Sequence, residues 1–379
     1  MGPLEGVKVI ELAGLAPVPY AGMILADFGA DVVRVDRAPA GEPKFDASRD
    51  SLGRGKRSLG INLKDPQGVE LLLRLLESAD VLIEPFRPGV MEKLGLGPDV
   101  VSARNPKLIY ARLTGWGQKG SFAPMAGHDI NYIALSGALS LFGRKGEKPI
   151  PPVNLIGDFA GGGMLCAMGI AMALFERTRS GAGQVIDAAM IDGAAHLSSF
   201  IFGFRGAGMW SDDRGTNMLD TGAPFYDTYE TSDGRYMSVG AIEPQFYAAL
   251  VEGLGFTPDD APKQWDQSIF EQTAATFTDI FKSKTRTEWT TIFDGTDACV
   301  APVLGLGEVS EHPHNAERKS FVTGVGGYTF PEAAPRLSRT PGRAVDTAPL
   351  PCADTDTVLS DLGLGADEIA ALKDANVIG

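Results

Sequence analysis

The stretch VKVIELAGLAPVPYAGMILADFGADVVRVDR, residues 7–37, decides the fold. It begins with the apolar run VKVIEL, continues with a helical pattern from Tyr20 to Phe28, and ends with a second apolar run, VVRV, close to Asp36. A strand, a helix and a strand in this order form a β-α-β unit, in which the two strands lie parallel. We therefore predict an α/β fold whose N-terminal part contains a parallel sheet.

The same alternation continues through about the first 120 residues of the chain. Asp65 and Pro66 mark a helix start, since a carboxylate suits the N-cap and proline suits the first helical position. VLIEPF and KLIYARL are the next two buried strands. Ligands bind such sheets beyond the carboxyl ends of the strands. We expect the long loop from Asp36 to Asn62 to lie there.

A change of pattern after residue 200 predicts a second, smaller domain. A glycine-rich connector from Gly203 to Gly222 is followed by DGRYMSV, a strand pattern, and EPQFYAALVEGLG, an amphipathic helix. We predict a large domain over residues 1–200 that is completed by residues 320–379. A linker over 201–225 and a small α/β domain over 226–319 make up the rest.

Composition and charge exclude several classes of partner. The 379 residues hold 34 Lys and Arg against 48 Asp and Glu, a net charge of −14, so the surface repels nucleic acid. The apolar stretch from Asp158 to Phe175 contains three consecutive glycines and is predicted to be a buried helix, not a membrane span. The N-terminus has no secretory or transit pattern. We expect a cytoplasmic protein without a membrane or nucleic-acid partner.

The segment from Lys44 to Lys64 reverses the sign of the charge. It holds six Lys or Arg and two Asp, a local net charge of +4. Arg54 and Lys56 flank a glycine whose backbone a ligand can approach closely, so the segment is a candidate phosphate cradle. A solvated charged loop is an equally good interpretation. Gly14, after the first strand, opens no GxGxxG pattern, and GRGKRS lacks the upstream glycine of a Walker loop, so a dinucleotide or ATP is not indicated.

Two polar residues are candidates for acid/base chemistry. His128 precedes Asp129 in AGHDIN, at a predicted helix start where the carboxylate can orient the imidazole. Chance for His128 and an N-cap role for Asp129 are the simpler interpretation. Asp158, in IGDFAGGG, is either an N-cap or a functional carboxylate. Each of the three glycines after Asp158 destabilises a helix by about 1 kcal/mol relative to alanine. Their presence indicates that some group approaches the backbone closely there, such as a thioester whose oxygen meets free N–H donors.

Three methionines follow Asp158 at helical spacing. Met164, Met168 and Met172 form an i, i+4, i+8 stripe. Such a stripe is usually plain core, although soft thioethers also suit a variable apolar substrate.

Several motifs together resemble the family III CoA-transferases. The resemblance runs from Val7 to about Gly342 and is carried, in order, by VVRVDR, RGKRSLGINLK, EPFRPGVMEKLGLGP, LTGWGQ, AGHDINY, GDFAGGG, GQVIDAAMIDG and PRLSRTPG. Within the superfamily, GHD is similar to the α-methylacyl-CoA racemase subfamily, because the transferases usually carry a large non-basic side chain where His128 stands. This resemblance implies a large Rossmann-like domain, a small α/β domain and an interlocked homodimer.

The resemblance also implies roles for individual residues. His128 and Asp158 would be the two acid/base groups, Asp129 would support the site, and Glu243 would be a hydrogen-bond partner of His128. The phosphates of CoA would meet four cations, namely Arg37, Arg54, Lys56 and Arg87. No metal and no separate cofactor are implied, since CoA is part of the acyl-CoA substrate.

Three functions remain open from the sequence. The first is a racemase that interconverts 2R and 2S 2-methylacyl-CoA thioesters through an enolate, with a base on one face of the carbon and an acid on the other. The second is a CoA-transferase in which Asp158 is the nucleophile and His128 is incidental. The third is a non-catalytic acyl-CoA-binding protein, in which the pair of His128 and Asp158 would have no use.

Overall fold

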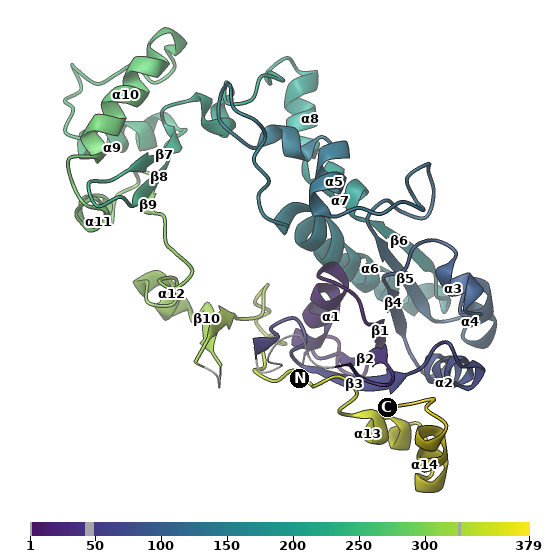
Figure 1. Ribbon diagram of the computed structural model, residues 1–379. Helices are drawn as coiled ribbons and strands as arrows, with labels where there is room; N and C mark the ends of the chain where they lie inside the picture. The colour runs from purple at the N-terminus through teal and green to yellow at the C-terminus, as the bar shows by residue number, and fades with distance from the viewer. Residues whose placement is uncertain (1, 42–48, 325–326) are drawn as a thin grey trace. The chain divides into compact units, whose positions relative to one another are not determined.

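The computed structural model describes residues 2–41, 49–324 and 327–379, so residues 44–48 of the predicted cradle lie outside the described residues (Figure 1). The chain divides into two compact units. The first comprises Met1–Ser136, Pro152–Ser198 and Ser310–Gly379, and the second comprises Gly137–Pro151 and Ser199–Val309. These bounds differ from the predicted domains in three ways. Residues 137–151 belong to the second unit, the predicted linker over 201–225 is part of that unit, and residues 310–319 belong to the first unit.

The first unit is built on a six-stranded sheet in the order β3-β2-β1-β4-β5-β6. All neighbouring strands are parallel, which confirms the predicted α/β fold with a parallel sheet (Figure 1). The strand order reverses between β1 and β4, and such a switch point is where this fold binds ligands. The strands are β1 (Lys8–Leu12), β2 (Asp31–Arg37), β3 (Lys56–Ile61), β4 (Val81–Glu84), β5 (Ile109–Thr114) and β6 (Val185–Ala189).

Helices cover both faces of this sheet because its strands are apolar on both sides. One face packs against α1 (Pro17–Asp27) and α6 (Leu165–Ser180). The other face packs against α2 (Pro66–Glu77), α3 (Val90–Lys93), α4 (Pro98–Arg104), α13 (Thr355–Asp361) and α14 (Ala366–Asp374). The helix start predicted at Asp65 is confirmed, since the Asp65 carboxylate accepts a hydrogen bond from Gln67 N at 2.8 Å.

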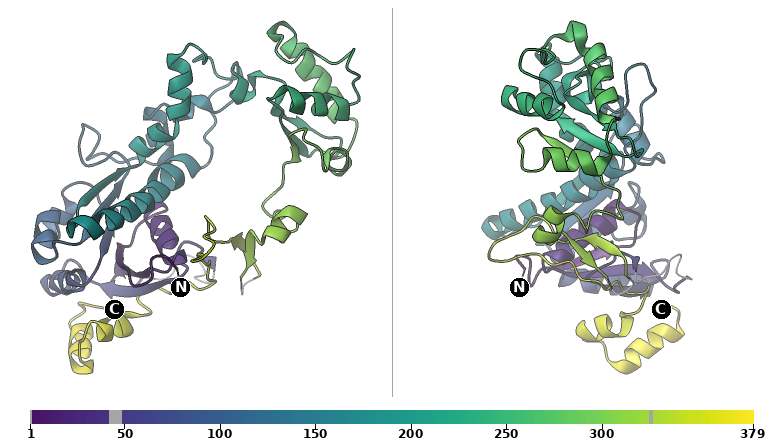
Figure 2. Two further views of the ribbon diagram at one scale, coloured as in Figure 1. Left: turned by 180° about the vertical axis from the view of Figure 1, so that it is seen from behind. Right: turned by 90° about the vertical axis from the view of Figure 1, so that its left-hand side faces the viewer.

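The C-terminal segment belongs to the first unit and packs at the β3 edge of the sheet. Figure 2 shows α13 and α14, in yellow, beside the strands of the N-terminal part. Ile378 forms an antiparallel bridge with Ile61, and the Gly60 N–H donates to Thr355 Oγ1 at 3.1 Å.

The long helix that contains Asp158 has an apolar sequence and a mixed environment. The segment Leu155–Ser180 is long and apolar enough to cross a membrane by length and composition, and 39% of its apolar window is buried inside the unit. Its buried side, with Cys166, Ala167 and Ile170, packs on the sheet. Met164, Met168 and Met172 are exposed instead, so within this chain the methionine stripe is not plain core.

The second unit has its own sheet and its own core. β7 (Tyr226–Glu230), β8 (Tyr236–Gly240) and β9 (Val300–Pro302) form an antiparallel sheet. Its core is rich in aromatic side chains from the sheet and the surrounding helices. The helices of this unit include α8 (Ser199–Gly206), α9 (Pro244–Gly253), α10 (Phe270–Phe281) and α11 (Arg286–Phe293). The chain returns to the first unit through α12 (Pro313–Arg318), β10 (Phe321–Thr323) and β11 (Thr329–Pro331).

Candidate active site

A pocket of about 460 Å³ lies in the first unit, at the carboxyl ends of three parallel strands. Its walls include residues 13–15 after β1, residues 85–88 after β4 and residues 115–116 after β5. The pocket therefore occupies the switch point between β1 and β4. His128 and Asp158 both line it.

His128 stands at the N-cap of α5 (Asp129–Leu135). Its backbone is extended, with φ −130° and ψ 172°, and its N–H donates to Asn131 Oδ1 at 3.0 Å. The side chain is exposed within this chain. An exposed imidazole on the rim of a pocket can exchange protons with a bound ligand and with solvent.

Asp158 lies in a π-helical segment, Leu155–Met164, that continues into α6. Burial raises the pKa of Asp158, and the negative charge of Asp129 raises it further. Two groups oppose this shift: Asn154 Nδ2 donates to Asp158 Oδ2 at 3.0 Å, and His128 lowers the pKa electrostatically. The pKa of Asp158 remains above its ordinary value. A half-buried carboxyl with a raised pKa is suited to giving and taking a proton.

Asp129 ties the segment of His128 to the segment of Asp158. Its Oδ2 accepts hydrogen bonds from Gly157 N at 2.6 Å and from Asp158 N at 2.7 Å, and its side chain is buried. Its Oδ1 is buried without a hydrogen-bond partner among the described residues. The backbone donors next to Asp158 are therefore occupied. The expectation that they are free for a thioester oxygen is wrong.

The three glycines after Asp158 allow backbone to meet backbone. Gly161 packs against α7 (Met190–Leu197), where a Cβ on Gly161 would lie 2.7 Å from Ala194 N and a Cβ on Gly193 would overlap Gly161 O. A Cβ on Gly163 would lie 2.6 Å from Pro17 O, in α1. The close approach indicated by the sequence is thus made by α7 and α1. These contacts account for the glycines without a ligand.

Lys56 forms a buried ion pair instead of facing the pocket. Its Nζ donates to Glu11 Oε1 at 3.0 Å, to Glu11 Oε2 at 2.7 Å and to Pro19 O at 2.8 Å, and both charged side chains are fully buried. An ammonium group has three donors, so none remains for a phosphate. This saturation corrects the interpretation of Lys56 as a CoA ligand.

Arg54 is also in a buried ion pair. Its Nε donates to Asp27 Oδ1 at 3.0 Å, a second nitrogen donates to Asp27 Oδ2, and a third donates to Pro331 O at 3.1 Å. Its side chain is only 5% exposed. Part of the positive charge of this segment therefore neutralises the buried carboxylates of Asp27 and Glu11. This pairing corrects the interpretation of Arg54 as a direct contact of the CoA phosphates.

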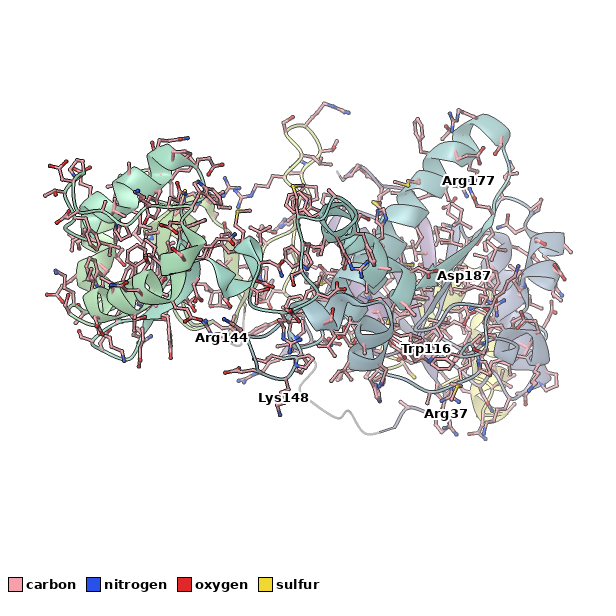
Figure 3. The ribbon with its side chains drawn as sticks, turned by 90° about the horizontal axis from the view of Figure 1, so that it is seen from above. Arg37, Trp116, Arg144, Lys148, Arg177 and Asp187 are labelled. Carbon is pink, nitrogen blue, oxygen red and sulfur yellow. The ribbon has the colours of Figure 1, made fainter. Side chains whose placement is uncertain are left out.

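The other predicted residues lie in different places. Arg87 lines the pocket and is exposed. Arg37, labelled in Figure 3, is the exposed last residue of β2. Glu243 belongs to the second unit, where it is the exposed N-cap of α9. Its hydrogen bond to His128 stays a prediction.

Sequence reasoning did not single out Asn154, Trp116 or Tyr132. Trp116, labelled in Figure 3, and Tyr132 line the pocket with ring centroids 4.8 Å apart and near-perpendicular planes. Burial raises the pKa of Tyr132, and the charge of Asp158 adds to the rise, so the phenol stays a hydrogen-bond donor. The available signal was the presence of both aromatic residues, each close to a glycine, in motifs LTGWGQ and AGHDINY.

Comparisons with known proteins identify the family of the chain. Residues 4–357 match CoA-transferase family III. The chain is 53% identical to alpha-methylacyl-CoA racemase of Homo sapiens, covering 99% of this chain and 97% of that protein. It is 54% identical to alpha-methylacyl-CoA racemase of Mus musculus, with the same coverage. A crystal structure of a CAIB/BAIF family protein from Brucella suis superposes with a TM-score of 0.81 at 26% identity, covering 95% of this chain and 99% of that one. The chain belongs to CoA-transferase family III.

Proposed function

We propose that the protein is an α-methylacyl-CoA racemase, which interconverts the 2R and 2S forms of 2-methylacyl-CoA thioesters. The observation that carries this proposal is that His128 and Asp158 line one pocket. The identity of 53% over 99% of the chain to a relative of that name supports the same reaction.

Inversion requires a proton to leave the α-carbon on one face and another to arrive on the opposite face. Neutral His128 with protonated Asp158 would convert one enantiomer, and imidazolium with carboxylate would convert the other. Each turnover reverses the protonation of the pair, so the two groups share one proton. The raised pKa of Asp158 brings its proton affinity closer to that of an imidazole, which lowers the cost of this exchange.

Binding of CoA would place the α-carbon between these two groups. We propose Arg87 as the main phosphate contact, because it is an exposed cation on the same pocket, and Arg37 as a second contact. Arg54 and Lys56 would act indirectly, by neutralising Asp27 and Glu11 beneath the site. Glu243 would accept a hydrogen bond from the His128 imidazole, and Asp129 would hold the backbone of Asp158.

CoA transfer is the second candidate function, and the position of Asp158 in the pocket is the observation that favours it. The Asp158 carboxylate would attack the thioester carbonyl, forming a mixed anhydride and releasing the CoA thiolate. The thiolate would then attack the anhydride at the Asp158 carbonyl, which gives an enzyme thioester and frees the first carboxylic acid. His128 has no necessary part in that sequence.

One assay separates the candidates. The protein is incubated in deuterated water with a single enantiomer of a 2-methylacyl-CoA and a different free carboxylic acid. Inversion with deuterium at the α-carbon supports the racemase, and CoA on the added acid indicates transfer. Absence of both would leave an acyl-CoA-binding protein. The control is His128→Ala, which should lose inversion while CoA binding changes little.

We also propose that the protein is a homodimer. Met164, Met168, Met172 and Phe175 form an apolar stripe on the long helix that a single chain leaves exposed. Monomeric proteins rarely leave contiguous apolar stripes uncovered. Light scattering should give the mass of two chains, and a monomer at micromolar concentration would contradict this proposal.

A further inference from the structure

The turn that carries His128 is held by side chains to which the proposed reaction gives no role. Tyr132, one turn into α5, donates its hydroxyl hydrogen to Gly127 O at 2.5 Å. Trp116 Nε1 donates to Ala126 O at 3.5 Å. The two peptide carbonyls before His128 therefore each face an aromatic side chain.

Two glycines make room for the Tyr132 ring. A Cβ on Gly127 would lie 2.7 Å from Tyr132 Cε1 and 3.0 Å from the Trp116 ring. A Cβ on Gly115 would overlap the Tyr132 ring. The ring thus fills the space between the segment after β5 and the turn before His128. Any other position of the ring would move that turn.

The Tyr132 side chain is itself well fixed. The residue is 7% exposed, and its ring packs edge-on against Trp116. The ring also packs within the core between the sheet and its covering helices. A buried phenol whose ring is packed and whose hydroxyl is hydrogen-bonded can determine the position of the neighbouring peptide.

We propose that Tyr132 is a positioning residue for His128: its hydroxyl fixes the Gly127 carbonyl and so directs the imidazole at the α-carbon. This inference rests on the proposed racemase function. It gives Tyr132, Gly115 and Gly127, from the motifs LTGWGQ and AGHDINY, a role in the reaction. Tyr132 itself exchanges no proton with the substrate.

The proposal predicts a defect confined to one face of the substrate. The Tyr132→Phe variant keeps the ring but loses the hydrogen bond to Gly127 O. The His128 imidazole is then no longer directed at the α-carbon. The enantiomer deprotonated by Asp158 would still form its enolate, which would be reprotonated on the same face. The enantiomer deprotonated by His128 would form its enolate slowly. Small misplacements of a reacting group cost up to about 100-fold in rate, and we expect about tenfold here.

The test measures inversion and α-deuterium exchange in deuterated water for both pure enantiomers, with wild type, Tyr132→Phe and Tyr110→Phe. Tyr110→Phe is the matched control, because Tyr110 is buried in the same unit and its hydroxyl donates to a backbone carbonyl, Leu96 O, at 2.8 Å. Circular dichroism and the urea midpoint establish that all three proteins are folded.

For Tyr132→Phe we expect kcat for inversion to fall about tenfold with little change in KM. The ratio of exchange to inversion should rise for one enantiomer only. Tyr110→Phe should match wild type in both measurements. Wild-type rates in Tyr132→Phe, or equal losses of exchange and inversion for both enantiomers, would overturn the inference. A wild-type protein that does not racemise would instead refute the proposed function.

Discussion

Replacing Asp129 by alanine should loosen the link between the segments that carry His128 and Asp158. The substitution leaves two backbone donors, Gly157 N and Asp158 N, without the carboxylate that now accepts from them at 2.6 Å and 2.7 Å. A hydrogen bond to a charged group contributes about 1.5–3 kcal/mol. Two such bonds amount to a loss of about 3–6 kcal/mol, a large share of the stability of about 5–15 kcal/mol that is typical of a domain.

Asp129→Asn separates the hydrogen bonds from the charge. The amide oxygen can still accept from both donors, so we expect roughly half of the loss seen with alanine. The free energy of unfolding is measured by urea titration with circular dichroism. The control is Asp80→Ala, because Asp80 also accepts from a backbone donor, Lys8 N at 2.8 Å, but at a partly exposed position. An Asp129→Ala loss no larger than that of Asp80→Ala would refute the reasoning.

The asparagine variant also tests the electrostatics of the site. The charge of Asp129 raises the pKa of Asp158, so its removal should lower that pKa. The limb of the kcat/KM profile that belongs to Asp158 should therefore move to lower pH. A limb that stays in place or moves to higher pH would show that the two carboxyl groups are not coupled in this way.

Four further substitutions test other contacts of the site and the core. Gly161→Ala should lower the free energy of unfolding by about 1–3 kcal/mol through overpacking against α7, whereas Gly169→Ala should raise it by about 0.4–1 kcal/mol, because its Cβ would meet Ile186 at an ordinary 3.6 Å. Changes of the same sign in thermal unfolding would contradict this prediction. Asn154→Ala removes the hydrogen bond from Asn154 to Asp158 that lowers the pKa of Asp158, so the limb of the kcat/KM profile that belongs to Asp158 should move to higher pH. A limb that does not move would show that Asn154 has no effect on the site. Lys56→Met should lower the free energy of unfolding by about 3–5 kcal/mol, because it leaves the buried Glu11 carboxylate unpaired, and should change KM for the acyl-CoA less than about twofold. A large rise in KM would show that Lys56 contacts the CoA phosphates.

The parts of the fold that could be predicted from the sequence are those with local causes. The apolar runs of β1 and β2 and the N-cap at Asp65 each depend on residues close together in the chain. The strand order adds long-range pairings, but the β-α-β pattern already restricts the sheet to parallel strands. The parallel fold was therefore predictable.

The parts that could not be predicted depend on partners far away in the sequence. Charge counting identified Arg54 and Lys56, but their carboxylate partners lie 27 and 45 residues away. The glycines after Asp158 indicated a close approach, yet the approaching groups are Gly193 of α7 and Pro17 of α1. Nothing local to the sequence shows that Asp129 accepts from the backbone next to Asp158.

The most direct measurement follows α-proton exchange in deuterated water for each pure enantiomer of a 2-methylacyl-CoA, with His128→Ala and with Asp158→Ala. If the two side chains act on opposite faces of one carbon, both variants lose inversion. Each should still exchange one enantiomer, and the two variants should exchange opposite ones. Exchange of the same enantiomer by both variants, or inversion that survives either substitution, would contradict the account.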